Sequence, residues 1–148
     1  MMKNKTSNTK KNKLFMPIAI VAGVGVVAFL IFGPSAGDDA VSVKLPSLSP
    51  LAVAGEAAFN ANCAVCHGKN GGGGTKLAPP LVHDTYNPGH HPDEAFRAAV
   101  HNGTTQHHWH FGNMPPAPQV SDAQVTRIIA YIRELQAANG IVAHPHQM

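Results

Sequence analysis

The chain has 148 residues, 13% of them charged, and it contains ten histidines and two cysteines. A chain of this length has room for one domain and an appendage. Its net charge of +3 arises from five lysines before residue 14, whereas six basic and eight acidic residues from position 35 onward give −2 with neutral histidines. This balance excludes the basic face of a nucleic-acid-binding domain, so we expect no nucleic-acid partner.

The N-terminal region is predicted to anchor the protein in a membrane. Residues 14–32 are nineteen consecutive uncharged, mostly apolar residues that follow a basic tail at residues 1–13. At about 1.5 Å per residue this run reaches about 28 Å, close to the hydrocarbon thickness of a bilayer. The preceding lysines predict that the tail is cytoplasmic and that a single span leaves the rest of the chain on the periplasmic side of the inner membrane. The alternative is a cleaved signal peptide, for which Pro34 makes a poor cleavage site.

Residues 33–50 are predicted to be a flexible linker. They contain Pro34, Pro46 and Pro50 among small residues, and they show neither helical nor strand periodicity. Residues 51–140 then form the folded domain, and residues 141–148 form a histidine-containing tail.

The folded domain is predicted to be all-α, because three segments have helical patterns and no segment has a convincing strand pattern. The first helix covers about residues 52–64. The second begins at Pro92 and ends at Gly103. The third begins with a capping box formed by Ser121 and Gln124. Its apolar residues share one face of the helix and are Val125, Ile128, Ile129, Ile132 and Leu135.

The first helix leads into Cys63-Ala64-Val65-Cys66-His67. Two cysteines at this spacing, followed at once by a histidine, are typical of the covalent attachment of a c-type haem with the histidine as proximal iron ligand. A zinc site would need two more cysteines or a suitably spaced pair of histidines, and the chain has no other cysteine. A thioredoxin-like pair would accompany a βαβ pattern, and none is visible. A disulfide across so few residues would be strained. We therefore predict one covalently attached haem c, around which a domain of about 90 residues can form its core.

A second iron ligand is predicted in the loop before the last helix. Met114 stands in the sequence Gly112-Asn113-Met114-Pro115-Pro116. A methionine in a loop ordinarily only packs against its neighbours. Here an iron with one protein ligand is already expected, and prolines that stiffen the backbone would hold the sulfur in position. We predict Met114 as the distal axial ligand.

With these motifs, residues 51–139 resemble a class I monohaem cytochrome c, here with an N-terminal membrane anchor. The resemblance implies a cytochrome c fold in which three to four helices surround one covalently bound haem. It also implies that Cys63 and Cys66 form the thioethers, and that His67 and Met114 are the two axial ligands.

The resemblance implies roles for further residues. The carbonyl of Pro79 would accept a hydrogen bond from His67 and orient its ring. Leu81 would pack against the haem. Gly55 and Phe59 would cross the last helix at a face formed by Ile128, Tyr131 and Ile132.

The histidines go beyond the resemblance. Histidines also occur at positions 83, 90, 91, 101, 144 and 146, and the densest group is His107-His108-Trp109-His110. Three interpretations of this group remain open. It packs as a loop, with Trp109 against the haem edge or donating its indole N–H to a propionate. It binds copper or zinc, since imidazole suits both. It supplies an alternative axial ligand in place of Met114.

The predicted function is electron transfer. With both axial positions occupied, the iron offers no open site, so we expect an electron carrier that is not an enzyme and has no small-molecule substrate. Its partners would be redox proteins that dock transiently. The alternatives are a haem subunit of a larger membrane oxidase or reductase, a sensor or peroxidase-like domain with a displaceable methionine, and a histidine-rich metal-handling protein.

Overall fold

The computed structural model describes residues 40–144. These residues form four α-helices and two short 3₁₀ helices, which are Pro50–Asn62 (α2), Ala64–His67 (α3), Lys69–Gly71 (η1), Asp84–Tyr86 (η2), Asp93–Asn102 (α4) and Asp122–Ala138 (α5). Within this part of the chain there is no strand, only an isolated antiparallel bridge between Thr104 and Met114. The all-α prediction is therefore confirmed for residues 40–144.

The predicted tail at residues 1–13 and transmembrane helix at residues 14–32 lie outside the described residues. Among residues 40–144, no helix has the length and apolar character needed to cross a membrane.

The helices begin where side-chain caps are available. The Ser49 hydroxyl accepts a hydrogen bond from the backbone N–H of Ala52 at the start of α2, two residues before the predicted start. At the start of α5, Ser121 and Gln124 form the predicted capping box. Gly103 follows α4 with a φ of 71°, as expected for the glycine that ends a helix.

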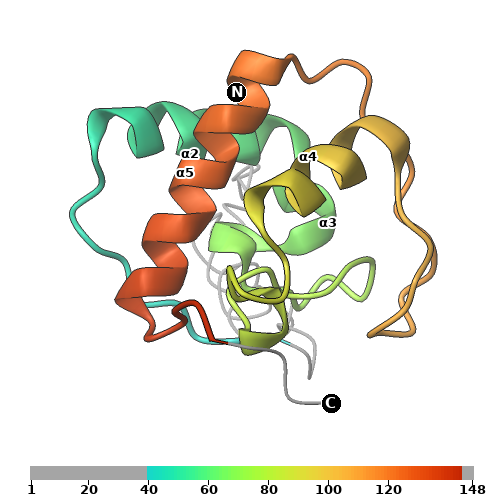
Figure 1. Ribbon diagram of the computed structural model, residues 1–148, viewed down its shortest axis with the longest axis horizontal. Coiled ribbons are helices and arrows are strands. Elements are labelled where there is room, and N and C mark those ends of the chain that lie inside the picture. Colours follow the sequence, from blue (N-terminus) through green and yellow to red (C-terminus); the bar gives the residue numbers. More distant parts are fainter. Residues whose placement is uncertain (1–39, 145–148) are drawn as a thin grey trace, which may run out of the picture. The chain divides into compact units, whose positions relative to one another are not determined.

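The core forms where α5 crosses α2 (Figure 1). The rings of Phe59 and Tyr131 lie 5.6 Å apart, and both side chains are buried. A Cβ on Gly55 would lie 1.9 Å from the backbone oxygen of Arg127, so the two helices approach closely at this glycine. The predicted apolar face of α5 is buried at each of its positions, which are Val125, Ile128, Ile129, Ile132 and Leu135.

The prediction of a flexible linker at residues 33–50 does not hold for its described part. The N–H of Lys44 donates to the Asn139 side chain at 2.8 Å, and the Asn139 amide donates back to the Lys44 carbonyl at 2.9 Å. The Ser49 N–H and hydroxyl donate to the Glu134 carboxylate at 2.9 and 2.6 Å. The segment that contains Lys44 and Ser49 therefore packs against α5 and the residue after it. Its hydrogen-bond partners lie 95 and 85 positions away in the sequence.

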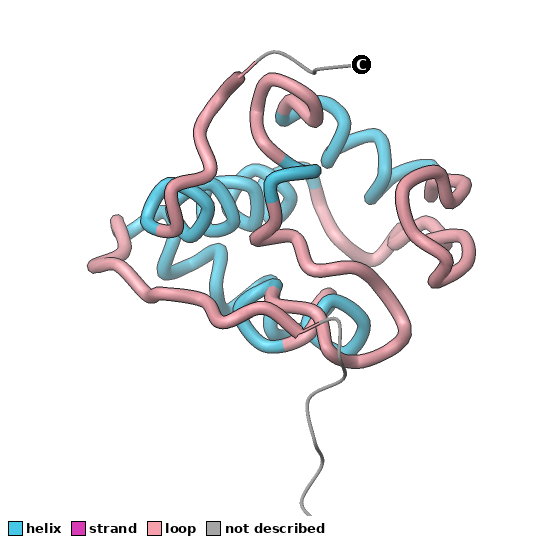
Figure 2. The backbone as a smooth tube through the Cα atoms, turned by 90° about the horizontal axis from the view of Figure 1, so that it is seen from below, coloured by secondary structure: helices cyan, strands magenta, loops and turns pink. Residues whose placement is uncertain are grey.

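Long loops connect α3 to α4 and α4 to α5 (Figure 2). The first of them is held by the last helix through Gln136, whose side chain is fully buried (0% exposed). Its amide donates to the carbonyls of Leu81 at 2.8 Å and Tyr86 at 3.0 Å. Buried backbone carbonyls need such partners, so α5 fixes the course of a loop that is far from it in sequence.

Candidate functional site

Cys63 and Cys66 lie at the junction of α2 and α3. Cys63 is the residue between the two helices, and its N–H donates to the Phe59 carbonyl at 2.8 Å. Both thiols are half-buried and not joined by a disulfide. Burial, with a smaller contribution from Cys66, raises the pKa of Cys63 to about 11. The cysteine therefore keeps its proton at neutral pH, unlike the low-pKa thiol of a disulfide oxidoreductase.

His67 is the last residue of α3, and its side chain is buried. Its Nδ1 lies 2.9 Å from the carbonyl oxygen of Pro79. This oxygen can only accept, so Nδ1 carries the proton and the lone pair lies on Nε2. Burial lowers the pKa of His67, and the bond to Pro79 partly opposes the change. The result is a neutral, oriented imidazole with Nε2 as the available metal donor.

A tight turn at Gly68 closes the chain behind His67. Gly68 has a φ of 75°, and a Cβ there would lie 1.9 Å from the carbonyl oxygen of Gly73. The N–H of Gly73 donates to the His67 carbonyl at 2.8 Å. The hydroxyl of Thr75 donates to the Cys66 carbonyl. These contacts hold the backbone of Cys66 and His67. The turn requires glycine at position 68, because a side chain there would prevent it.

Trp109 places a buried indole N–H beside Tyr86. Its indole Nε1 is fully buried and makes no hydrogen bond of good geometry among residues 40–144. The ring makes an edge-on contact with His83 at 5.0 Å. Burial raises the pKa of Tyr86 to about 12, and a hydrogen bond with the Trp109 side chain opposes this rise. The Trp109 indole and the Tyr86 hydroxyl thus interact between the two long loops.

Met114 and Leu81 lie on the two long loops. Met114 is half-buried, and its backbone exchanges two hydrogen bonds of 3.0 Å with Thr104, which closes the loop between them. Leu81 is half-buried and packs against the core, while its N–H donates to the Gly71 carbonyl at 2.7 Å. The roles of Met114 and Leu81 toward a haem remain predictions.

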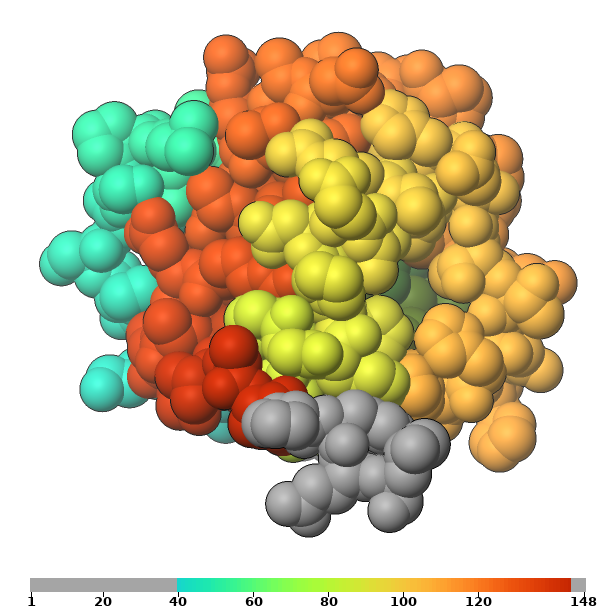
Figure 3. All heavy atoms as spheres, in the orientation of Figure 1, coloured from blue at the N-terminus to red at the C-terminus, as the bar shows by residue number. Residues whose placement is uncertain are grey.

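The surface is hollowed between the two loops. Figure 3 shows a depression bordered by the yellow-green segment after residue 80 and by the light orange segment before residue 120. The atoms at its floor are green, the colour of the chain around α3. The segments that carry the predicted ligands thus surround one concave region.

The histidines that lie together in the structure differ from the group expected from the sequence. His108 lies with His90 and His91, and the ligand atoms of these three residues are within 4.8 Å of one another. His110 is exposed and is not part of this group. Sequence reasoning did not include His90 and His91 in the group, and their adjacency is the only sequence signal for them. Their contact with His108 joins two loops whose approach depends on the tertiary fold.

Comparisons with known proteins give one family. A family model described as cytochrome c matches residues 52–136, which is more than half of the chain. No curated protein matches the sequence significantly.

Proposed function

Because the chain belongs to the cytochrome c family, we propose that it is a class I monohaem cytochrome that transfers single electrons with histidine–methionine axial ligation. Membership of the family implies haem c as cofactor and haem-based electron transfer as the general function. The helical fold of residues 40–144 agrees with this family.

The residues around α3 fit a haem. The two reduced thiols have the spacing for two thioether bonds. The buried imidazole of His67 has its lone pair on Nε2, as an iron ligand requires. These two features together support haem attachment more strongly than the cysteine spacing alone.

The chain's own residues would prepare the cofactor for electron transfer. Haem c, when bound, supplies a one-electron couple between Fe(II) and Fe(III). Cys63 and Cys66 would hold the group covalently, and the Pro79 carbonyl keeps the ring of His67 in one tautomer and one orientation. Met114 would supply a thioether as the sixth ligand, which favours the reduced state and excludes exogenous ligands.

We further propose that the domain is tethered by residues 14–32 to the inner membrane and works on its periplasmic side. Its partners would be redox proteins that donate and accept electrons, not small-molecule substrates. The net charge of −2 after residue 35 argues against a large lysine ring as the docking surface. Docking would then depend on a small, largely uncharged surface and be weak and transient.

The single observation that carries the proposal is the hydrogen bond between His67 Nδ1 and the Pro79 carbonyl, directly after the cysteine pair. A potentiometric titration of the purified full-length protein, followed by its absorption spectrum, tests it. We expect one covalent haem per chain, a single one-electron wave, low-spin spectra in both states and no binding of carbon monoxide to the reduced form. A high-spin spectrum with ready carbon monoxide binding would instead indicate a sensor or peroxidase-like domain.

Replacing Met114 with alanine should open the sixth position. We expect the oxidised protein to lose its weak methionine-to-iron charge-transfer band, and the reduced protein to gain carbon monoxide binding. The Met114→His variant serves as the matched control, because it should restore a low-spin spectrum while lowering the potential by on the order of 100 mV. If the alanine variant keeps the charge-transfer band, another residue is the distal ligand.

A further inference from the structure

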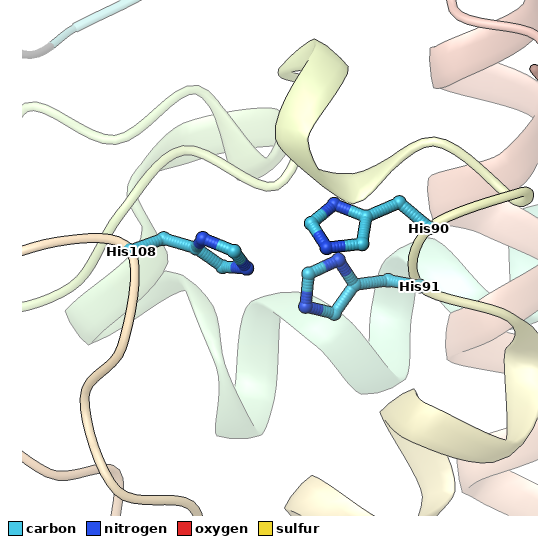
Figure 4. Close-up of side chains that lie close together, drawn as sticks. All are labelled: His90, His91 and His108. Carbon is cyan, nitrogen blue, oxygen red and sulfur yellow. The ribbon is translucent and has the colours of Figure 1, made fainter. Parts of the chain in front are cut away.

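A second group of metal-binding side chains lies apart from the proposed iron ligands. His90 and His91 come from the loop after η2, and His108 comes from the loop after α4. Their ligand atoms all lie within 4.8 Å of one another. Figure 4 shows the ring of His108 pointing toward the rings of His90 and His91 across a small gap. Two loops therefore present imidazoles to one point.

One carbonyl group sets the tautomer of two of these rings. Nδ1 of His90 lies 3.0 Å from the Thr85 carbonyl oxygen, and Nδ1 of His91 lies 2.8 Å from the same atom. A carbonyl oxygen has two lone pairs and no proton, so both Nδ1 atoms donate to it. The lone pairs of both rings then lie on Nε2. A backbone carbonyl behind the ring is the usual device that orients a metal-binding histidine.

The backbone beneath His90 and His91 is held rigidly. The side chain of Asn87 is buried, and its oxygen accepts from the N–H groups of Gly89 at 2.9 Å and His90 at 3.2 Å. The Asn87 carbonyl accepts from the N–H of His91 at 2.8 Å. On the other side, the guanidinium of Arg133 donates to the His91 carbonyl. The two imidazoles are thus attached to a preorganised segment, which lowers the cost of binding an ion.

The facing loop carries a fourth imidazole. The ring of His107 lies 4.3 Å from that of His108 and 5.8 Å from that of His91. Its Nδ1 lies 2.8 Å from the Thr105 carbonyl, which again leaves the lone pair on Nε2. The loop is closed by Gln106, whose N–H donates to Asn113 and whose side chain accepts from Gly112.

The donor set consists of imidazoles, with no carboxylate among them. Burial lowers the pKa of His91, the Thr85 carbonyl opposes this change, and the neighbouring imidazoles lower the pKa further. The acidic residues on either side of His90 and His91 in the sequence have other partners: Asp84 is paired with His144 at 2.8 Å, and Asp93 with Arg133 at 2.8 Å. Imidazole without carboxylate suits Zn²⁺ and Cu²⁺, whereas Mg²⁺ and Ca²⁺ require oxygen ligands.

We propose that His90, His91 and His108 bind a borderline divalent transition-metal ion, Zn²⁺ or Cu²⁺, with His107 positioned to become the fourth ligand. In a tetrahedral site with metal–nitrogen distances of about 2.0–2.1 Å, the donor atoms lie about 3.4 Å apart. A shift of the exposed His108 toward the fixed pair closes the difference from the present 4.8 Å. The inference does not depend on the haem ligation, because it uses none of the proposed iron ligands.

Calorimetric titration with Zn²⁺ tests the site on full-length holoprotein purified without a polyhistidine tag. We expect one ion per chain with micromolar or tighter affinity, tighter binding of Cu²⁺ as the Irving–Williams order requires, and no response to Mg²⁺. The triple variant His90→Ala, His91→Ala, His108→Ala should weaken Zn²⁺ binding by at least about 100-fold. The electron paramagnetic resonance spectrum of bound Cu²⁺ should show coupling to imidazole nitrogens.

The matched control removes three histidines that lie outside the group, through His101→Ala, His110→Ala and His144→Ala. This variant should bind Zn²⁺ as the unmodified protein does. The single variant His108→Ala, at an exposed loop position, tests the site without risk to the fold and should weaken binding at least about tenfold. Equal affinity in the unmodified protein and the His90/His91/His108 variant, or an equal loss in the control, would overturn the proposal. An unchanged haem spectrum in each variant shows that the fold and the iron ligands are intact.

Discussion

Replacing both Cys63 and Cys66 with serine is expected to leave the chain without covalently attached haem. These are the only two cysteines, and a serine hydroxyl does not form the thioether that links a c-type haem to the protein. The expected result is complete loss of haem-dependent staining on a denaturing gel and of haem absorbance that remains with the unfolded chain. Each single variant should retain a haem attached through one thioether.

Val65→Ala is the matched control for this experiment. Val65 stands between the two cysteines, and the residue is 72% exposed. Its truncation should leave the haem content of the protein unchanged. Haem that stays on the denatured double serine variant would contradict thioether attachment, and loss of haem from the Val65→Ala variant would show that the assay reports folding instead.

Replacing Gly55 with alanine should lower the free energy of unfolding by about 3 kcal/mol, at the upper end of the range for overpacked cores. In an ordinary helix the same change would stabilise the protein by about 0.5–1 kcal/mol. Here the added Cβ would lie 1.9 Å from the Arg127 oxygen and 2.9 Å from the Tyr131 Cβ. The first of these is a backbone atom, so α2 and α5 have to separate. Phe59 and Tyr131 then lose part of their contact.

Unfolding of full-length Gly55→Ala protein in denaturant, followed by circular dichroism, measures this effect. A loss of this size corresponds to a fall in the melting temperature of roughly 10 °C or more for a domain of this length. Ala54→Gly, at an exposed position of the same helix, is the control and should cost only about 0.5–1 kcal/mol. A midpoint for Gly55→Ala at or above that of the unmodified protein would mean that the helices cross elsewhere.

The features predicted correctly from sequence are those that depend on local patterns. The Ser121–Gln124 capping box and the apolar face of α5 lie within one helix, so their residues determine the structure without reference to distant partners. The family resemblance implies that Gly55 packs against the face of the last helix that contains Tyr131, and the structure contains this contact.

The features that were missed depend on partners far away in sequence. Ser49 and Lys44 lie in a proline-containing segment with no periodicity, and only Glu134 and Asn139 on α5 reveal why it is ordered. The grouping of His90 and His91 with His108 likewise requires two loops to meet. No local pattern specifies that meeting, because the loop that carries His90 and His91 is held by Gln136 and Arg133 of α5.

The crossing of α2 and α5 also constrains the order in which the domain can mature. It joins the first and last helices of the described chain, so it is a contact of large sequence separation that forms only after most of the loop-closure entropy has been lost. Until Asp122–Ala138 has been synthesised, Phe59 lacks Tyr131, and the loop that carries His90 lacks Gln136. The cysteines next to α2 therefore remain on an unclosed chain throughout synthesis of the residues between them and α5. The last helix to be made sets the moment at which the domain closes.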